Sequence, residues 1–161
     1  MIKVKLSDLI FDEISQMGII LLEEETTQKV LPIWVGLFEA QAILFKLQNM
    51  YFPRPLTHDL LKNVVETLGG IVELVLISLV KDNTFYAEIH IRVGEKKFVL
   101  DSRPSDAIAL AVRTSSPIYV SEEIMSTVFI SKEDFTKEQK EKFYKQLLEF
   151  ADTEEDKRLK H

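Results

Sequence analysis

Two short segments of the chain combine the residue types that bind phosphate and move protons. Residues 53–59 (PRPLTHD) and residues 101–106 (DSRPSD) each contain an arginine and a proline, then a hydroxyl residue and an aspartate. Both stand where an apolar helical pattern begins, where proline suits the first turn and Ser or Thr can cap free N–H groups. The start of a helix attracts anions, and an adjacent arginine can bind phosphate or carboxylate through two parallel hydrogen bonds. We therefore expect the two segments to be halves of one polar site.

Three aspartates, Asp59, Asp101 and Asp106, are the candidate metal ligands and catalytic carboxylates. Carboxylates suit Mg²⁺ or Mn²⁺, and such ions assist phosphodiester cleavage by activating water and stabilising the leaving oxygen. For each aspartate taken alone, a favourable charge at the start of a helix is the more common explanation. Their grouping with two arginines favours a site.

His58 is the candidate group for proton transfer, because the unperturbed pKa of histidine lies near neutrality. Side chains adjacent on a helix point about 100° apart, so His58 and Asp59 are not expected to pair. We expect the partner of His58 to be Asp101 or Asp106. The other two histidines, at positions 90 and 161, are expected to take no part.

Arg54 and Arg103 are the candidate phosphate-binding residues, since a guanidinium group is permanently charged and can bind two oxygens at once. The alternative is that they form internal ion pairs, Arg54 with Asp101 or Arg103 with Asp59, which hold loops together. Arg113, after the apolar residues of its helix, is expected to bind the last carbonyls of that helix.

Glu39 and several aromatic residues are weaker candidates. Glu39 is either a catalytic carboxylate or, more simply, a favourable charge at the start of a helix. Trp34, Phe85 and Tyr86 could stack on bases, although aromatic residues on strands more often belong to a core or an interface. The sequence has no phosphate-binding Gly-Lys-Ser/Thr loop, no dinucleotide fingerprint and no serine–histidine–aspartate order, so we expect no organic cofactor.

The surrounding pattern predicts the elements that must position these side chains. Helices are expected at 38–49 and 57–68 and after Pro104, and strands at 2–10, 18–24, 29–35, 71–80, 84–93, 96–101 and 117–120. Polar turns indicate a hairpin around 25–28 and an antiparallel meander from 71 to 101, and Pro32 suggests an edge or a bulge.

The helix after Pro104 is apolar on all sides, which is typical of an enclosed helix. We therefore predict an α+β fold with a mixed, largely antiparallel sheet, helices packed on it and one nearly all-apolar buried helix. The domain is expected to span 1–130. A charged helical tail is expected at 131–161, where Thr136 and Gln139 form a capping-box pattern.

Composition restricts the class of function. A net charge of −6 disfavours stable binding of a long duplex, and the lack of cysteine excludes disulfides and thiolate chemistry. No apolar run approaches the ~20 residues that cross a bilayer, and Asp8 interrupts any signal-peptide pattern, so we expect no membrane and a cytoplasmic protein. Abundant Lys and Glu without Cys are typical of thermophilic sources.

Several motifs occur together in a recognisable order. They are residues 31–36 (LPIWVG), 39–40 (EA), 54–59 (RPLTHD), 84–87 (TFYA), 101–110 (DSRPSDAIAL) and 117–120 (PIYV). On these motifs the chain resembles the bifunctional nuclease family. The resemblance implies a nuclease that degrades RNA and DNA without sequence preference, and it supplies neither catalytic residues nor a mechanism.

These observations predict a small homo-oligomeric nuclease that hydrolyses phosphodiester bonds in RNA or DNA. Its metal would be held by the three aspartates, its phosphate by the two arginines, and its proton moved by His58. The alternative is a non-enzymatic homo-oligomeric binding or assembly module whose Arg-Pro-Asp corners are structural or bind a small anion. A regulator that binds nucleic acid without cleaving it is disfavoured by the charge. Homo-oligomerisation is inferred from the apolar strands and the edge strand.

Overall fold

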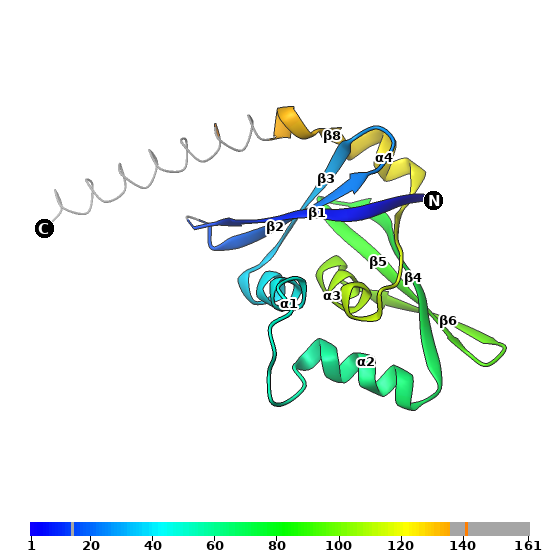
Figure 1. Cartoon of the computed structure of the whole chain (residues 1–161). Helices are drawn as coiled ribbons and strands as arrows, with labels where there is room; N and C mark the ends of the chain where they lie inside the picture. The colour runs from blue at the N-terminus through cyan, green and yellow to red at the C-terminus, as the bar shows by residue number, and fades with distance from the viewer. Residues whose placement is uncertain (14, 136–140, 142–161) are drawn as a thin grey trace, which may run out of the picture.

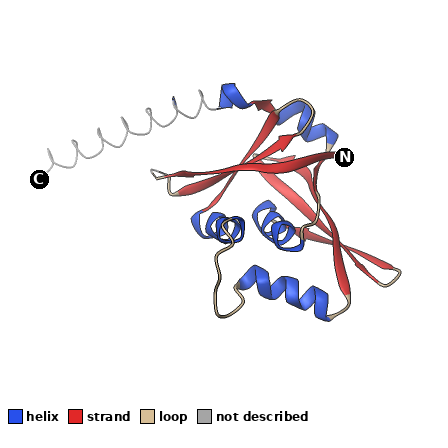
Figure 2. Cartoon of the chain, viewed as in Figure 1, coloured by secondary structure: helices blue, strands red, loops and turns tan. Residues whose placement is uncertain are grey.

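A computed structural model of the chain describes residues 1–13, 15–135 and 141. The described strands are β1 (Ile2–Asp12), β2 (Met17–Glu24), β3 (Lys29–Gly36), β4 (Gly70–Lys81), β5 (Thr84–Val93), β6 (Lys96–Ser102), β7 (Ile118–Val120) and β8 (Ile130–Ser131). The helices are α1 (Leu37–Leu47), α2 (Thr57–Thr67), α3 (Pro104–Thr114) and α4 (Glu122–Val128) (Figures 1 and 2). None of these helices exceeds 11 residues, and no helix in the described part could span a membrane.

All eight strands form one sheet in the order β6-β5-β4-β7-β1-β2-β3-β8. Every neighbouring pair is antiparallel except β4 and β7, which run parallel. The predicted α+β class with a mixed, largely antiparallel sheet is therefore confirmed. The predicted β2–β3 hairpin and the β4–β5–β6 meander are present as well.

Pro32 lies where β3 is an edge. The partner strand β8 pairs only with Lys29 and Val30, so among the described strands Pro32 of β3 has a neighbour on one side alone. A proline cannot donate to a second ladder and is tolerated at such an edge. The prediction of an edge position is confirmed.

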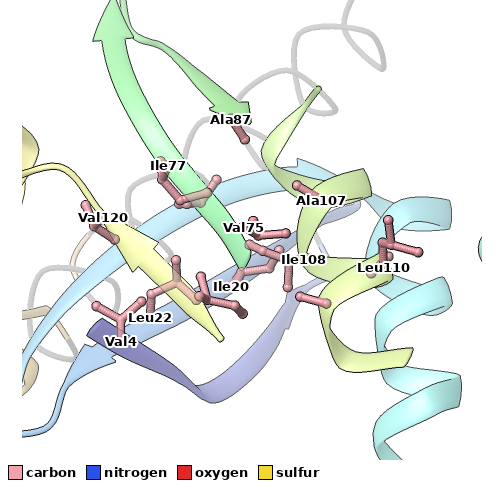
Figure 3. Packing of buried hydrophobic residues seen from close by; sticks show 14 of the residues in the cluster. Val4, Ile20, Leu22, Val75, Ile77, Ala87, Ala107, Ile108, Leu110 and Val120 are labelled. Atoms are coloured by element: carbon pink, nitrogen blue, oxygen red, sulfur yellow. The ribbon is translucent and has the colours of Figure 1, made fainter. Parts of the chain in front are cut away.

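Helix α3 lies in the middle of the molecule, between the sheet and the helices α1 and α2 (Figure 1). Ala107, Ile108 and Leu110 are at most 1% exposed and belong to one core with Val75 and Ile77 of β4; Ile108 lies beside Val75, and Leu110 lies on the side of the helix that faces α1 (Figure 3). Each large apolar side chain buried in this way contributes about 1.5–3 kcal/mol of transfer free energy. The predicted enclosed helix is confirmed, and its burial holds its first turn in a fixed position on the sheet.

A second, smaller core covers the other face of β2. Ile19, Leu21 and Val30 pack there against Phe135, which is 2% exposed. Strand β2 is buried on both faces, which explains its continuous apolar run. Phe135 lies beyond the predicted domain limit at 130, and the remainder of the predicted tail helix lies outside the described residues, apart from residue 141.

Candidate active site

Each of the two Arg-Pro segments leads into a helix, but the caps differ from the prediction. Leu56 precedes α2 and Arg103 precedes α3, and neither residue caps its helix with a side chain. Pro104 occupies the first turn as expected, which moves the buried Ser105 into the helix. At α2 it is Asp59 that accepts a hydrogen bond from the Leu56 N–H, at 3.0 Å. Capping by Thr57 is therefore wrong, because Thr57 is already the first residue of the helix.

Asp106 joins the starts of α2 and α3. Its Oδ1 lies 2.9 Å from His58 Nε2, and its Oδ2 accepts a hydrogen bond of 2.7 Å from Arg103 Nε. Burial raises the pKa of the Asp106 carboxyl, but the hydrogen bonds from Arg103 and His58 outweigh burial and hold the pKa below its ordinary value. The carboxylate is therefore ionised, and the expected pairing of His58 with Asp106 is present.

Arg103 extends this chain of contacts to α1. Its Nη1 donates to Glu39 Oε1 at 3.2 Å. The contacts with Asp106 and Glu39 raise the pKa of Arg103, which is a charged donor. His58, Asp106, Arg103 and Glu39 thus form one continuous line of polar contacts across the three helices. The sequence left two roles open for Glu39, a catalytic carboxylate or a charge at the start of a helix, and the structure adds its contact with Arg103.

Arg113 forms a second network on the buried side of the helices. It is 5% exposed, and its Nε donates to Asp59 Oδ1 at 2.8 Å. Its other nitrogens donate to the carbonyls of Ala109 and Ala42, both at 2.9 Å. The carbonyl of Ala109, in the same helix, is the kind of partner that was predicted. Asp59 was not expected as a partner, and burial of its carboxyl is outweighed by Arg113 and the Leu56 N–H, which lower its pKa.

The ion pairs predicted for the two candidate arginines are not those that form. Arg103 binds Asp106 and Glu39 in place of Asp59. Arg54 is exposed in the loop before α2, and within the described residues it forms no ion pair with Asp101. Asp59 instead forms an ion pair with the buried Arg113, because both residues lie at the contact between α2 and α3.

The three candidate metal ligands lie in different surroundings. Both oxygens of Asp59 are bonded, to Arg113 and to the Leu56 N–H, and both oxygens of Asp106 are bonded to His58 and Arg103. Asp101 is exposed on β6, opposite Glu88. Across residues 1–13, 15–135 and 141, no three His, Cys, Asp or Glu side chains are grouped so as to hold a metal ion. The arrangement does not fit a divalent ion held by these three carboxylates.

An open cleft of about 650 Å³ lies beside Arg103. Its walls are β3, the turn between β4 and β5, and the first turns of α1 and α3; the lining includes Trp34, Gly36, Glu39, Phe85, Arg103 and Ser105. Arg54, His58 and Asp101 are not among the lining residues. The lining therefore combines apolar and aromatic walls with the Arg103 cation and the Glu39 carboxylate. Asp106, which also contacts His58, binds Arg103 and does not line the cleft.

Gly36 allows Glu39 to occupy its place in the cleft. A Cβ atom at position 36 would overlap with the Glu39 carboxylate, which folds back over the start of α1. The sequence did not lead us to expect this close approach. The available signal was the spacing, with an acidic residue three positions after a glycine at the start of a helix.

The fold and the cleft are those of an α+β protein with an arginine–carboxylate site between its helix starts and its sheet. Residues 19–133 match the profile of the Bifunctional nuclease domain, and the chain belongs to this family. The resemblance noted in the sequence is thereby confirmed.

Named relatives extend the comparison. An uncharacterised protein of Mycobacterium tuberculosis is 38% identical over 108 residues, which cover 67% of this chain and 64% of that protein. Bifunctional nuclease 1 of Oryza sativa subsp. japonica is 32% identical over 116 residues, covering 70% of this chain and 35% of the rice protein. Bifunctional nuclease 2 of Arabidopsis thaliana is 33% identical over 106 residues, covering 64% and 32% respectively. The chain thus spans just under two thirds of the mycobacterial protein and about a third of the plant proteins.

Proposed function

We propose that this chain hydrolyses phosphodiester bonds in RNA or DNA strands that enter the cleft beside Arg103. The observation that carries the proposal is the placement of Arg103, whose guanidinium opens on the cleft in a chain of the bifunctional nuclease family. Two plant relatives carry nuclease names, and that property is extended here to the present chain.

Arg103 is the phosphate-binding residue in this proposal. Asp106 and Glu39 each take one of its N–H groups, and the guanidinium keeps further donors for the oxygens of an anion. Its side chain is 65% exposed, so an incoming phosphate can reach it. Charge that develops on the phosphate during attack would be stabilised by this fixed cation.

Glu39 is the proton acceptor in this proposal. A water molecule attacks phosphorus, and the Glu39 carboxylate takes one proton from that water as the new P–O bond forms. The P–O bond to the leaving nucleoside oxygen breaks, and that oxygen takes a proton from solvent. Glu39 then returns its proton to solvent. His58 and Asp106 act as positioning residues, since they bind Arg103 or each other and do not line the cleft.

The cleft walls suit a single strand. Trp34 is 41% exposed and Phe85 partly so, and both line the cleft, where aromatic faces can stack on bases of any sequence. A volume of about 650 Å³ is in the usual range for a small-molecule site and therefore has room for little more than a nucleotide or two. The net charge of −6 adds no broad basic face for a duplex.

The test compares wild-type protein with Arg103→Ala and Glu39→Gln on labelled single-stranded RNA and DNA, with Mn²⁺, with Mg²⁺ and with chelator. Arg92→Ala is the matched control, because Arg92 pairs with Glu73 on the sheet face away from the helices. Loss of about a hundredfold or more in cleavage rate is expected for each cleft variant, with the control unchanged. Equal rates in all four identically purified proteins would reject the proposal and indicate a contaminant.

A second candidate is the non-enzymatic binding or assembly module, and one observation favours it. Asp59 and Asp106 have all their oxygens bonded within the protein, which is the arrangement of structural ion pairs. This account explains the buried Arg113 network fully. It does not explain why Arg103 and Glu39 face an open cleft. Binding of a nucleotide that is lost in Arg103→Ala, without turnover in any protein, would select it.

A further inference from the structure

Strand β6 ends the sheet with an apolar edge. Among the described strands it pairs with β5 alone (Figure 1), and its central residues Phe98, Val99 and Leu100 are 46%, 56% and 47% exposed. The other terminal strand, β8, has only two residues. A long apolar edge with unpaired backbone groups readily accepts another strand, and natural proteins usually cover or interrupt such an edge. We therefore expect another strand to cover this edge of β6.

We propose that β6 pairs antiparallel with β6 of a second copy of this chain, about a two-fold axis at Val99. This register sets Lys97 opposite Asp101 twice and Phe98 opposite Leu100 twice. The sequence KKFVLDS is thus complementary to itself in charge and in apolar character. Opposite charges and apolar pairs directly across two strands are each stabilising.

The alternative symmetric registers lack this match. Residues directly opposite in an antiparallel pair share a face of the sheet, so a two-fold axis perpendicular to the sheet must pass beside a residue. An axis at Phe98 sets Lys97 opposite Val99, and an axis at Leu100 sets Asp101 opposite Val99. Each leaves a charge against an apolar side chain. Among these three central positions, an axis at Val99 alone sets Lys97 opposite Asp101 and Phe98 opposite Leu100.

The two faces of the joined sheet would also be consistent with the fold. Phe98 and Leu100 lie opposite Ile91 and Ile89 of β5, so they point to the face that α3 covers. Pairing would continue this apolar face across the axis. Val99 points to the other face, flanked by the Lys97–Asp101 pairs. The pairing supplies a partner for Asp101, for which the described part of the chain gives neither an ion pair nor a side-chain hydrogen bond. Lys97 lies 3.9 Å from Glu73 within its own chain, and its exposed ammonium would be shared between Glu73 and Asp101 of the second copy.

The sharpest test exchanges the charges. Lys97→Asp and Asp101→Lys each place two pairs of like charges across the axis, and each should weaken the dimer by about tenfold or more. Mixing the two variants restores both opposite-charge pairs, so a heterodimer should form at concentrations where each variant alone is monomeric. Native mass spectrometry distinguishes the species, and light scattering gives the state of the wild type. Lys96→Asp is the matched control, because Lys96 faces the neutral Ser102 in this register.

A disulfide tests the register directly. The chain has no cysteine, so Val99→Cys introduces one thiol per subunit. In the proposed register the two Cα atoms at the axis are about 4.5–5.5 Å apart, a distance that a disulfide spans. Mild oxidation should give a covalent dimer. Lys96→Cys should not crosslink, since its two positions lie about 20 Å apart along the strands.

The outcomes separate the possibilities. A wild-type dimer with charge-exchange heterodimers and a Val99→Cys crosslink supports the proposal. A monomeric wild type at micromolar concentrations overturns it, as does a dimer that is indifferent to both charge changes and fails to crosslink at position 99. The proposal does not rest on nuclease activity, and failure of one leaves the other standing.

Discussion

His58 Nε2 lies 2.9 Å from Asp106 Oδ1, across a separation of 48 residues in the sequence. The contact fixes the first turn of α2 to the first turn of α3. Because the second oxygen of Asp106 binds Arg103, the histidine also determines where the cleft arginine stands. The position of Arg103, which lines the cleft, thus depends on His58, which does not.

The Asp106 pair makes part of the stability depend on acid pH. The pKa of this carboxyl lies below its ordinary value of 3.8, so its contribution to stability is present above that pH and is lost as the pH falls toward the lowered value. Between about pH 5 and pH 3, wild-type protein should therefore lose more free energy of unfolding than Asp106→Asn. Urea unfolding at a series of pH values measures both slopes, and identical slopes would contradict the pairing.

Arg113→Ala should be among the most destabilising single substitutions in the chain. It leaves Asp59 as an unpaired carboxylate and removes the donors to the carbonyls of Ala42 and Ala109. Arg113 is buried, but the Asp59 side chain is 37% exposed and can be partly hydrated, so we expect a loss toward the lower end of the about 3–5 kcal/mol that breaking a fully buried pair costs. Chemical denaturation measures the loss.

The control for this substitution is Arg92→Ala, which removes a more exposed arginine from its pair with Glu73. It should cost about 1 kcal/mol or less. If Arg113→Ala costs no more than the control, the Arg113 network does not hold the three helices together.

The helices and strands could be predicted from the sequence because their signals lie in neighbouring residues. Turn residues and alternation define the hairpins, and the all-apolar pattern defines α3. The partner of His58 was limited to Asp101 or Asp106 because few polar partners were available near the helix starts, and in the structure it is Asp106. The Asp59–Arg113 pair was missed, because Arg113 was assigned only the carbonyls of its own helix. A lone arginine on an otherwise enclosed helix is a signal for a carboxylate on a neighbouring helix.

The remaining features depend on the order of the strands, which no local pattern contains. The parallel pairing of β4 with β7 places the start of α3 beside β3 and completes the cleft. Glu39 meets Arg103 only through this arrangement, 64 residues apart in the sequence. The metal site was expected because three aspartates share two motifs. The three carboxylates do not form a group, because Asp59 is bonded to Arg113 and the Leu56 N–H, and Asp106 is bonded to His58 and Arg103.

Gly36→Ala should act through Glu39. The added methyl group overlaps with Glu39 Oε2, so the carboxylate has to turn, and we expect this movement to disturb the contact of Glu39 Oε1 with Arg103. Under the proposed mechanism the cleavage rate should fall to that of Glu39→Gln. The informative control is Gly36→Ala in a Glu39→Ala background, where the methyl group meets no carboxylate and should cause no further loss. Equal losses in both backgrounds would mean that the methyl group acts by another route.

Phe135→Ala tests whether the chain beyond 131 belongs to the folded body. Phe135 is 2% exposed in the small core with Ile19 and Leu21, and its ring lies 6.2 Å from that of Trp34 in an edge-on arrangement. Loss of a buried phenylalanine costs about 3–5 kcal/mol. Trp34 is the only tryptophan in the chain, so its fluorescence reports the change at this core directly.

The accompanying control is Phe38→Ala, because Phe38 is 80% exposed and should change the free energy of unfolding by about 0.5 kcal/mol or less. A stability loss in Phe135→Ala together with altered Trp34 emission would place residues 132–135 within the cooperative fold. Unchanged stability and emission would mean that this segment does not stabilise the sheet.

Trp34 also lines the cleft, so the same substitution should alter base stacking there and reduce affinity for a single strand more than Phe38→Ala does.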